Sequence, residues 1–296
     1  MTRLALLVDR VRVEEKLLIQ ELGRRPGLEV DVLAISDLVF DPLAPPARRY
    51  DLVLNRTVSL SRGLAALDLF EAAGAVTLNS RSVVARCGDK VRMSAALARA
   101  GVPQPQLRVA TSPAAALRAL DELGYPAVLK PAVGSWGRLM ARLRDRDAAE
   151  ALFEHKATLG GPQHGVFYLQ AYVDKPGRDL RAFVIGGETV CAIERRSEHW
   201  ITNTARGAVT AGFPVDPDLD RISRAAARAV AGPDAMIAVD LFESPDGYLV
   251  GEVNATMEFR NSIETTGVDL PARVVDHAVA VASRGIEARF GAGAAA

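Results

Sequence analysis

The 296-residue chain has few cysteines, no net charge and no long apolar run, and each of these absences excludes a class of function. Its two cysteines, Cys87 and Cys191, are too few for a disulfide framework or a cysteine-based zinc site, so we expect a reduced, cytoplasmic setting. Basic and acidic residues balance at 36 each, which leaves no overall basic field for nucleic acid. No apolar run approaches the roughly 20 residues of a membrane-spanning helix, so no membrane partner is expected.

Familiar catalytic motifs are missing as well. The four histidines do not show the spacing of metal ligands, and no serine or cysteine has the sequence context of a nucleophile. Because lysine is rare beside arginine, each lysine merits separate inspection.

Strands and helices alternate over the first 80 or so residues. Apolar runs predict strands at 4–8, 28–33, 51–54 and 76–78, and helical spacing predicts helices at 14–22 and 61–73. The charged pair Asp9-Arg10 after the first run favours a buried strand over a signal peptide. This alternation predicts a small doubly wound α/β domain over residues 1–85.

The rest of the chain changes character near residue 166. Before it, we expect helices at 82–100, 113–123 and 147–159, with strands at 127–130 and 139–143. After it, strands predominate, at 167–173, 180–185 and 189–195 and in a hairpin at 238–253, with helices at 217–231 and 270–283. The small-residue tail, 289–296, is predicted to be disordered.

The hairpin carries the strongest chemical signal. Asp240 lies on its first strand, and Glu252 and Asn254 share one face of the second, after a turn at 244–247. Two carboxylates and an amide oxygen suit Mg²⁺ bridged to nucleotide phosphates better than Zn²⁺. The alternative is an ordinary hairpin with polar residues on its wet face.

Lysines and glycines form a second group of candidates. Lys130 ends an apolar strand and Lys90 begins a helix, positions from which either could meet phosphate. Lys130 could instead extend to solvent. The turn that follows contains Gly134, Ser135, Trp136, Gly137 and Arg138, which could cradle phosphate or form an ordinary hairpin.

Three further segments could bind a ligand. The segment Gln170, Ala171, Tyr172 and Val173 could pair with an adenine edge, or be an ordinary edge strand. Arg178, Arg181, Arg195 and Arg206, with Asp179 and Asn203, suggest an anionic ligand; surface ion pairs are the alternative. The polar stretch with Glu258, Arg260, Asn261 and Thr265 could form an amino-acid pocket or a solvated loop.

In order and spacing, these segments resemble the ATP-grasp ligases. The resemblance covers all but the tail and points to the branch that contains RimK, ArgX and LysX. It is strongest to LysX, the type of ligase that joins 2-aminoadipate to the small carrier protein LysW. Its most specific segments are 59–65, 87–90, 129–138, 200–207, 256–261 and 265–269.

The resemblance implies an ATP-grasp fold with a central lobe at 86–165 and a C-terminal lobe at 166–288. It implies that Lys90, Lys130 and a flap at 134–138 bind the phosphates of ATP, that 170–173 and Arg178 contact the nucleotide, and that Asp179 contacts the ribose. Asp240, Glu252 and Asn254 would hold two Mg²⁺ ions. Arg195, Arg206 and Asn203 would stabilise an acyl phosphate, with Arg195 and Asn203 also contacting substrate. Glu258, Arg260, Asn261 and Thr265 would bind the amino acid.

The implied partners are an acidic LysW-type carrier, an amino acid and a second copy of the chain in a dimer or tetramer. Ala255 and Glu264 depart from the LysX pattern, which has histidine at both positions. The amino acid is therefore open among 2-aminoadipate, glutamate and an unusual amino acid, since one methylene is hard to discriminate by packing. A RimK-like ligase for a ribosomal protein and an inactive nucleotide-binding protein are the remaining alternatives.

Overall fold

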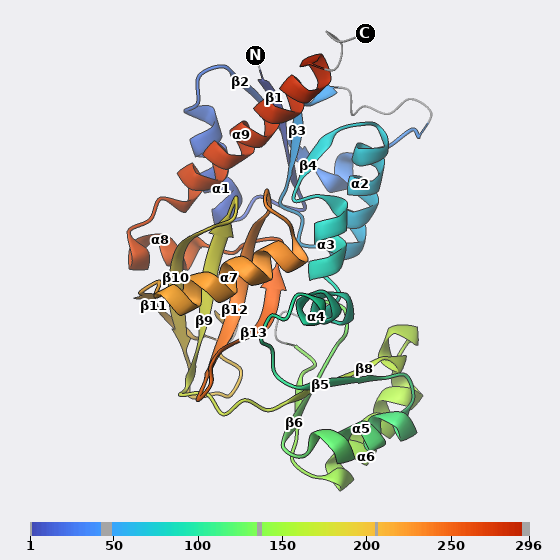
Figure 1. Ribbon diagram of the computed structural model, residues 1–296. Helices are drawn as coiled ribbons and strands as arrows, with labels where there is room; N and C mark the ends of the chain where they lie inside the picture. Colours follow the sequence, from blue (N-terminus) through green and yellow to red (C-terminus); the bar gives the residue numbers. More distant parts are fainter. Residues whose placement is uncertain (1, 43–48, 135–137, 205–206, 292–296) are drawn as a thin grey trace.

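The computed structural model describes residues 2–42, 49–134, 138–204 and 207–291, which form three lobes (Figure 1). The N-terminal and central lobes lie at opposite ends of the molecule, and the C-terminal lobe adjoins both. Within these ranges, no helix combines the length and apolar character needed to cross a bilayer.

The N-terminal lobe is a parallel four-stranded sheet of order β2-β1-β3-β4 with helices on both faces, as predicted. Alternate residues of β1 face opposite sides, so Leu4 and Leu6 pack toward α1 while Ala5 and Leu7 pack toward α2. The elements are β1 (Thr2–Val8), α1 (Val13–Gly23), β2 (Leu28–Ala34), η1 (Ile35–Asp37), β3 (Leu52–Asn55), α2 (Leu60–Ala72), β4 (Val76–Leu78) and α3 (Arg81–Cys87).

The central lobe is an antiparallel sheet of order β5-β8-β6-β7 covered by two helices. Ser112 caps α5 by accepting a hydrogen bond from the Ala115 amide, and Asp145 caps α6 in the same way. The elements are β5 (Leu107–Ala110), α5 (Pro113–Leu123), β6 (Ala127–Lys130), β7 (Ala141–Leu143), α6 (Arg146–Leu159), η3 (Pro162–Gly165) and β8 (Phe167–Ala171).

The C-terminal lobe is an antiparallel sheet of order β11-β10-β9-β12-β13. The predicted hairpin is present, with Asp240 opposite Glu252 in register. The elements are α4 (Lys90–Arg99), which packs on this sheet, β9 (Arg178–Ile185), β10 (Glu188–Arg196), β11 (Val209–Phe213), α7 (Pro217–Val230), β12 (Met236–Ser244), β13 (Gly247–Asn254), α8 (Arg260–Thr266) and α9 (Leu270–Gly291).

One hydrophobic core joins the N-terminal and C-terminal lobes. Helix α9 runs beside α1, and its residues Val274 and Ala278 share a buried cluster with Leu6 of β1 and Phe183 of β9 (Figure 1). Because the apolar side chains of α9 are buried against both lobes, they stabilise the contact between the two lobes.

The predicted helix at 82–100 is wrong in one respect, because it is two helices, α3 and α4. Asp89 begins α4 as its N-cap, accepting hydrogen bonds from the Val91 and Arg92 amides. At Gly88, an added Cβ would lie 2.5 Å from a methyl carbon of Leu60, so glycine permits the close approach of α2.

Two edge strands and one short helix lie where no regular element was expected. Strands β5 and β11 are short and largely exposed, so they carry little apolar pattern. Helix α8 occupies the polar stretch for which an amino-acid pocket and a solvated loop were the two interpretations, and Gly267 ends it in a left-handed conformation. Helix α9 continues to Gly291, past both its predicted end at Ser283 and the predicted start of the tail.

Candidate active site

A cleft between the central and C-terminal lobes, here called the interlobe cleft, gathers many of the candidate residues. Its walls come from β6 and β8 on one side and from β9, β10, β12 and β13 on the other. Apolar side chains such as Met140 and Phe242 lie beside charged ones. The charged residues are Lys130, Lys175, Asp179, Arg195, Asp240 and Glu252. This combination suits a ligand with a flat apolar part and a charged part.

Lys130 does not extend to solvent. Its side chain is buried at the end of β6, and Nζ lies 5.8 Å from the centroid of the Phe242 ring. No hydrogen bond or ion pair joins this ammonium to another residue of the described ranges. Burial lowers the pKa of Lys130 to about 8, and the nearby Glu252 only partly opposes this effect. An anion in the cleft would therefore stabilise the charged form.

Asp240 is a buried carboxylate held by two guanidiniums. Arg181 donates to both of its oxygens at 2.7 and 2.9 Å, and Arg195 Nη2 lies 3.1 Å from Oδ2. Burial would raise the pKa of Asp240, but the two arginines lower it to about 2. Asp240 is thus fully ionised at neutral pH.

A second buried carboxylate, Asp179, extends this network toward the cleft. It accepts hydrogen bonds from Arg195 Nε at 2.6 Å and from the Thr202 hydroxyl, which in turn accepts from Lys175 Nζ at 2.6 Å. Within the described ranges, Arg195 Nη1 is buried without a partner. Burial alone would lower the pKa of Arg195, yet Asp240 and Asp179 raise it, so the side chain is a permanent cation with one unused donor.

Beside the cleft, Glu252, Asn254 and Asn203 share a second depression, the hairpin recess, with Lys90 and Gly134. Lys90 Nζ lies 2.9 Å from Glu252 Oε1 and donates to the Gly134 carbonyl at 3.0 Å. In the described part of the chain, these contacts place Lys90, the hairpin and the start of the predicted flap together.

The donor set fits a hard divalent cation. The Asn254 amide nitrogen is 3.5 Å from Asp240 Oδ2, and Asp240 opposes Glu252 in the hairpin, so the three side chains converge. No group of three or more His, Cys, Asp and Glu side chains suited to a metal occurs among the described residues. A metal here would therefore use two carboxylates, an amide oxygen and oxygens of the ligand, which is the arrangement of Mg²⁺ with phosphates.

The end of β8 lines the other side of the interlobe cleft. Strand β8 lies between β5 and β6, so the edge-strand alternative is wrong. The Ala171 and Tyr172 amides donate to Gln106 and Pro126 carbonyls, whereas the Val173 amide has no partner among the described residues and remains for a ligand.

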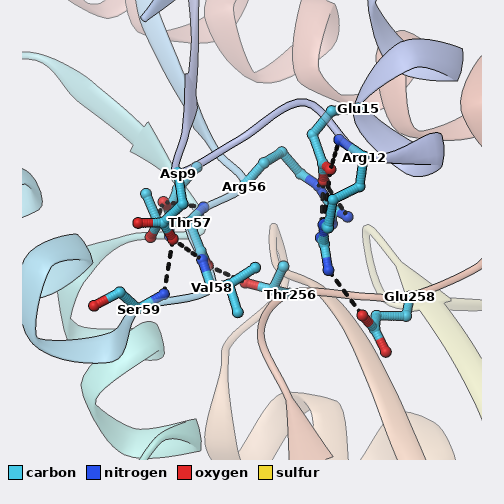
Figure 2. A network of polar contacts seen from close by, with 10 residues as sticks. Asp9, Arg12, Glu15, Arg56, Thr57, Val58, Ser59, Thr256 and Glu258 are labelled. Atoms are coloured by element: carbon cyan, nitrogen blue, oxygen red, sulfur yellow. Dashed lines mark hydrogen bonds and ion pairs between the residues drawn. The ribbon is translucent and has the colours of Figure 1, made fainter. Parts of the chain in front are cut away.

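A third depression, the arginine recess, lies between the N-terminal and C-terminal lobes. Two carboxylates, Glu14 and Glu258, line it together with the guanidiniums of Arg10, Arg12, Arg138, Arg181, Arg195 and Arg260. Figure 2 shows Arg12 and Glu258 meeting across the boundary between the two lobes. Such a surplus of positive charge favours a ligand with several anionic groups.

The structure brings most of the predicted site residues together, with two exceptions. Arg178 turns away from the cleft and forms ion pairs with Glu243 and Glu194, which argues against nucleotide binding. Thr265 is exposed on α8 and donates to the Asn261 carbonyl one turn earlier. The predictions for Ser135, Trp136, Gly137 and Arg206 fall outside the described residues.

Sequence reasoning missed several residues that line the cleft. Trp200 lies 6.3 Å from Tyr172 between ring centroids, and the Arg142 guanidinium stacks on both rings. Lys175 and Phe242 were missed as well, although a lysine after the candidate adenine-binding segment was visible in the sequence.

Comparisons with known proteins agree with one another over most of the chain. Residues 87–278 match the RimK-like ATP-grasp domain, and residues 4–86 match the LysX preATP-grasp domain. The glutamate–LysW ligase ArgX of Sulfurisphaera tokodaii is 33% identical over 278 residues, covering 93% of this chain and 97% of that protein. The α-aminoadipate–LysW ligase LysX of Saccharolobus solfataricus is 33% identical over 270 residues, covering 90% and 97%. A RimK domain ATP-grasp protein from Sphaerobacter thermophilus superposes with a TM-score of 0.75 at 27% identity, covering 94% of this chain and all of that one.

Proposed function

The chain belongs to the RimK-like ATP-grasp family of ligases, and from this premise we propose that it joins an acidic amino acid to a LysW-type carrier protein. The substrate that we propose is 2-aminoadipate. Glutamate is the alternative, because a glutamate–LysW ligase and an α-aminoadipate–LysW ligase are equally identical to the chain. One observation supports the proposal above all others: Arg195 lines both the interlobe cleft and the arginine recess. A group at this junction is in reach of ligands in both sites.

ATP would occupy the interlobe cleft. The adenine would lie against the end of β8, where the Val173 amide is open, and the phosphates would lie toward Lys130 and Lys90. Both lysines are buried, so each would meet phosphate in a setting where charge attraction is only weakly screened. Asp179, which Arg195 and Thr202 hold in place, is the proposed ribose contact.

Asp240, Glu252 and Asn254 would hold Mg²⁺, two ions by our prediction. The ions would neutralise charge on the transferred phosphoryl group. For Glu252 to bind a metal, its contact with Lys90 has to loosen, which would free the Lys90 ammonium for phosphate. The two changes are consistent with each other because one ligand supplies both the cation and the anion.

The reaction needs positioned charges but no protein nucleophile. An oxygen of the carrier's C-terminal γ-carboxylate attacks the γ-phosphorus of ATP, ADP leaves, and an acyl phosphate forms. The α-amine of the amino acid then attacks the acyl carbon, and phosphate leaves with one proton while a second goes to solvent. Arg195, with its unused Nη1 donor, and Asn203 are the residues that would stabilise the developing charge.

The test is incubation of the protein with ATP, Mg²⁺ and a LysW-type carrier, with 2-aminoadipate or glutamate in separate reactions. Intact-mass spectrometry of the carrier then reports ligation. A mass gain only with 2-aminoadipate supports the proposed reaction, and a gain only with glutamate supports the alternative. No gain with either amino acid would refute both substrates, and a ribosomal-protein acceptor would be tested next, because relatives of that type match 76% of the chain.

A further inference from the structure

Arg12 connects the N-terminal lobe to the proposed substrate site. It precedes α1, and its Nη1 donates to Glu258 Oε1 at 2.8 Å across the boundary between the lobes (Figure 2). Glu258 belongs to the segment between β13 and α8, so the contact joins residues that are 246 positions apart. Helix α1 is therefore placed to control a side chain that lines the recess.

The arginine is held rigidly on its other side. Its Nε and Nη2 each donate to the Glu15 carboxylate at 2.9 Å, and Glu15 has a side-chain exposure of 0%. Arg56 also donates to Glu15, at 3.1 Å, and its guanidinium lies 5.7 Å from the centroid of the Phe259 ring. This buried pairing fixes the guanidinium plane, so the third nitrogen of Arg12 presents a fixed donor to Glu258.

Glu258 keeps one oxygen available. Arg12 occupies Oε1, while no hydrogen bond within the described ranges reaches Oε2, and the side chain is 32% exposed. Glu258 lines both the arginine recess and the hairpin recess. The other carboxylate of the arginine recess, Glu14, does not line the hairpin recess. Glu258 alone of the two is therefore beside the place where the proposed acyl phosphate forms.

Residues that line the arginine recess carry two buried polar atoms without partners among the described residues. They are Arg195 Nη1 and the Ser262 hydroxyl oxygen, and both side chains are almost fully buried. Native proteins rarely leave such atoms unsatisfied, so they indicate a place where a polar ligand completes the hydrogen bonding. The recess thus offers one accessible carboxylate oxygen and several cationic groups.

We infer that Arg12 is a positioning residue that fixes Glu258 so that its Oε2 accepts the α-ammonium group of a dicarboxylic amino acid, whose carboxylates meet the surrounding guanidiniums. The inference rests on the proposed function and adds to it a role for the N-terminal lobe in binding the amine substrate. Arg12 acts through Glu258 and touches no reacting atom.

The test compares Arg12→Gln and Arg12→Lys with wild type. The lysine side chain keeps a positive charge beside Glu15 but has no further nitrogen to donate to Glu258. Arg12→Lys therefore controls for a folding defect caused by an unpaired Glu15. Arg25→Gln is the matched control, because Arg25 follows α1 and also bridges to the C-terminal part of the chain, through Asp276 at 2.9 Å, away from the recess. Far-ultraviolet circular dichroism and the unfolding midpoint check each variant.

Both Arg12 variants are expected to raise the KM for the amino acid roughly 10- to 100-fold, with the KM for ATP unchanged. The dicarboxylate that lacks only the amine, adipate for 2-aminoadipate or glutarate for glutamate, should inhibit wild type and both Arg12 variants with the same inhibition constant. Arg25→Gln should match wild type throughout. Equal weakening of binding of the dicarboxylate and of the amino acid would overturn the inference, because it would show a general distortion of the recess. An unchanged KM for the amino acid would overturn it as well.

Two further measurements separate this inference from the proposed function. The double variant Arg12→Gln/Glu258→Gln should weaken binding no more than Glu258→Gln alone, because Arg12 acts through Glu258. An effect of Glu14→Gln with none of Glu258→Gln would reject the chosen carboxylate. The second measurement is the shift of the unfolding midpoint when glutamate or 2-aminoadipate binds, and it requires no carrier protein. If wild type ligates no carrier but is stabilised by these amino acids more than Arg12→Gln, the proposed reaction fails and the inference stands. If neither amino acid shifts wild type, the inference fails whatever the ligation assay gives.

Discussion

Replacing Lys130 with methionine is expected to stabilise the fold while weakening nucleotide binding. The ammonium is buried at the end of β6 and has no ion-pair partner in the described part of the chain. Methionine keeps an unbranched side chain of similar length that can pack against Phe242 without a charge. The substitution therefore removes a desolvated charge that the fold alone does not need.

The magnitude follows from the pKa of Lys130. The difference between the ordinary value of 10.5 and about 8 corresponds, at about 1.4 kcal/mol for each pKa unit, to about 3 kcal/mol. Below pH 8 the folded and unfolded states both hold the proton, so this full cost destabilises the folded protein. Between pH 8 and 10.5 the folded state has released the proton and the unfolded state has not, so wild-type stability rises with pH. The advantage of Lys130→Met should thus be largest below pH 8 and vanish near pH 10.5.

Urea unfolding at pH 7 and at pH 10 measures this difference, and titration with a nucleotide analogue measures affinity. Loss of a charge-assisted phosphate contact should weaken nucleotide binding roughly 10- to 100-fold. Lys156→Met is the control, because burial also lowers the pKa of Lys156 but its ammonium donates to two backbone carbonyls far from the cleft. The control should lose stability and keep nucleotide affinity. The reasoning would be refuted if Lys130→Met were less stable than wild type at pH 7. It would also be refuted if the difference in free energy of unfolding between variant and wild type were the same at pH 7 and at pH 10.

The other predictions concern the hairpin. Glu252→Ala should abolish ADP formation in a coupled assay while leaving the unfolding midpoint within a few degrees of wild type, and undiminished turnover would reject its metal role. Arg181→Met should lower the free energy of unfolding by about 3 kcal/mol in urea, since it leaves the buried Asp240 with one guanidinium; no loss would mean that Arg195 suffices. Gly251→Ala should weaken nucleotide binding, because its Cβ would lie 2.6 Å from the Phe242 ring and displace it into the cleft; unchanged affinity would show that the ring has room to move.

Sequence patterns predicted the elements that have a strong apolar period. The strands of the N-terminal sheet, helix α5 and the hairpin follow this pattern to within a few residues, because each buries a regular face. Strands β5 and β11 escaped because exposed edges need no such face. The break between α3 and α4 was hidden because Asp89 caps locally while the helical period on either side continues.

The candidate site, too, was predictable from the sequence only in part. The shared face of Glu252 and Asn254 was predictable because they are two residues apart, and the pleat places such residues on one side of a strand. Side-chain direction was not readable, which is why Arg178 was assigned to the nucleotide although Glu243 and Glu194 hold it. The contact between Arg12 and Glu258 was beyond prediction, because it depends on how two lobes pack.

The charges around the hairpin explain why the proposed ion and nucleotide belong together. Apart from Glu258, which is paired with Arg12, the described residues that line the interlobe cleft and the hairpin recess include five cations and three carboxylates, which leaves two positive charges in excess. The cations are Lys90, Lys130, Lys175, Arg181 and Arg195, and the carboxylates are Asp179, Asp240 and Glu252. A divalent ion alone would double that excess in a poorly hydrated site, where like charges repel strongly. The Mg²⁺ complex of a nucleoside triphosphate carries two negative charges and balances the site. The same cations that weaken binding of a free metal ion therefore favour its entry as a nucleotide complex, and the two arginines beside Asp240 keep that carboxylate ionised until the complex arrives.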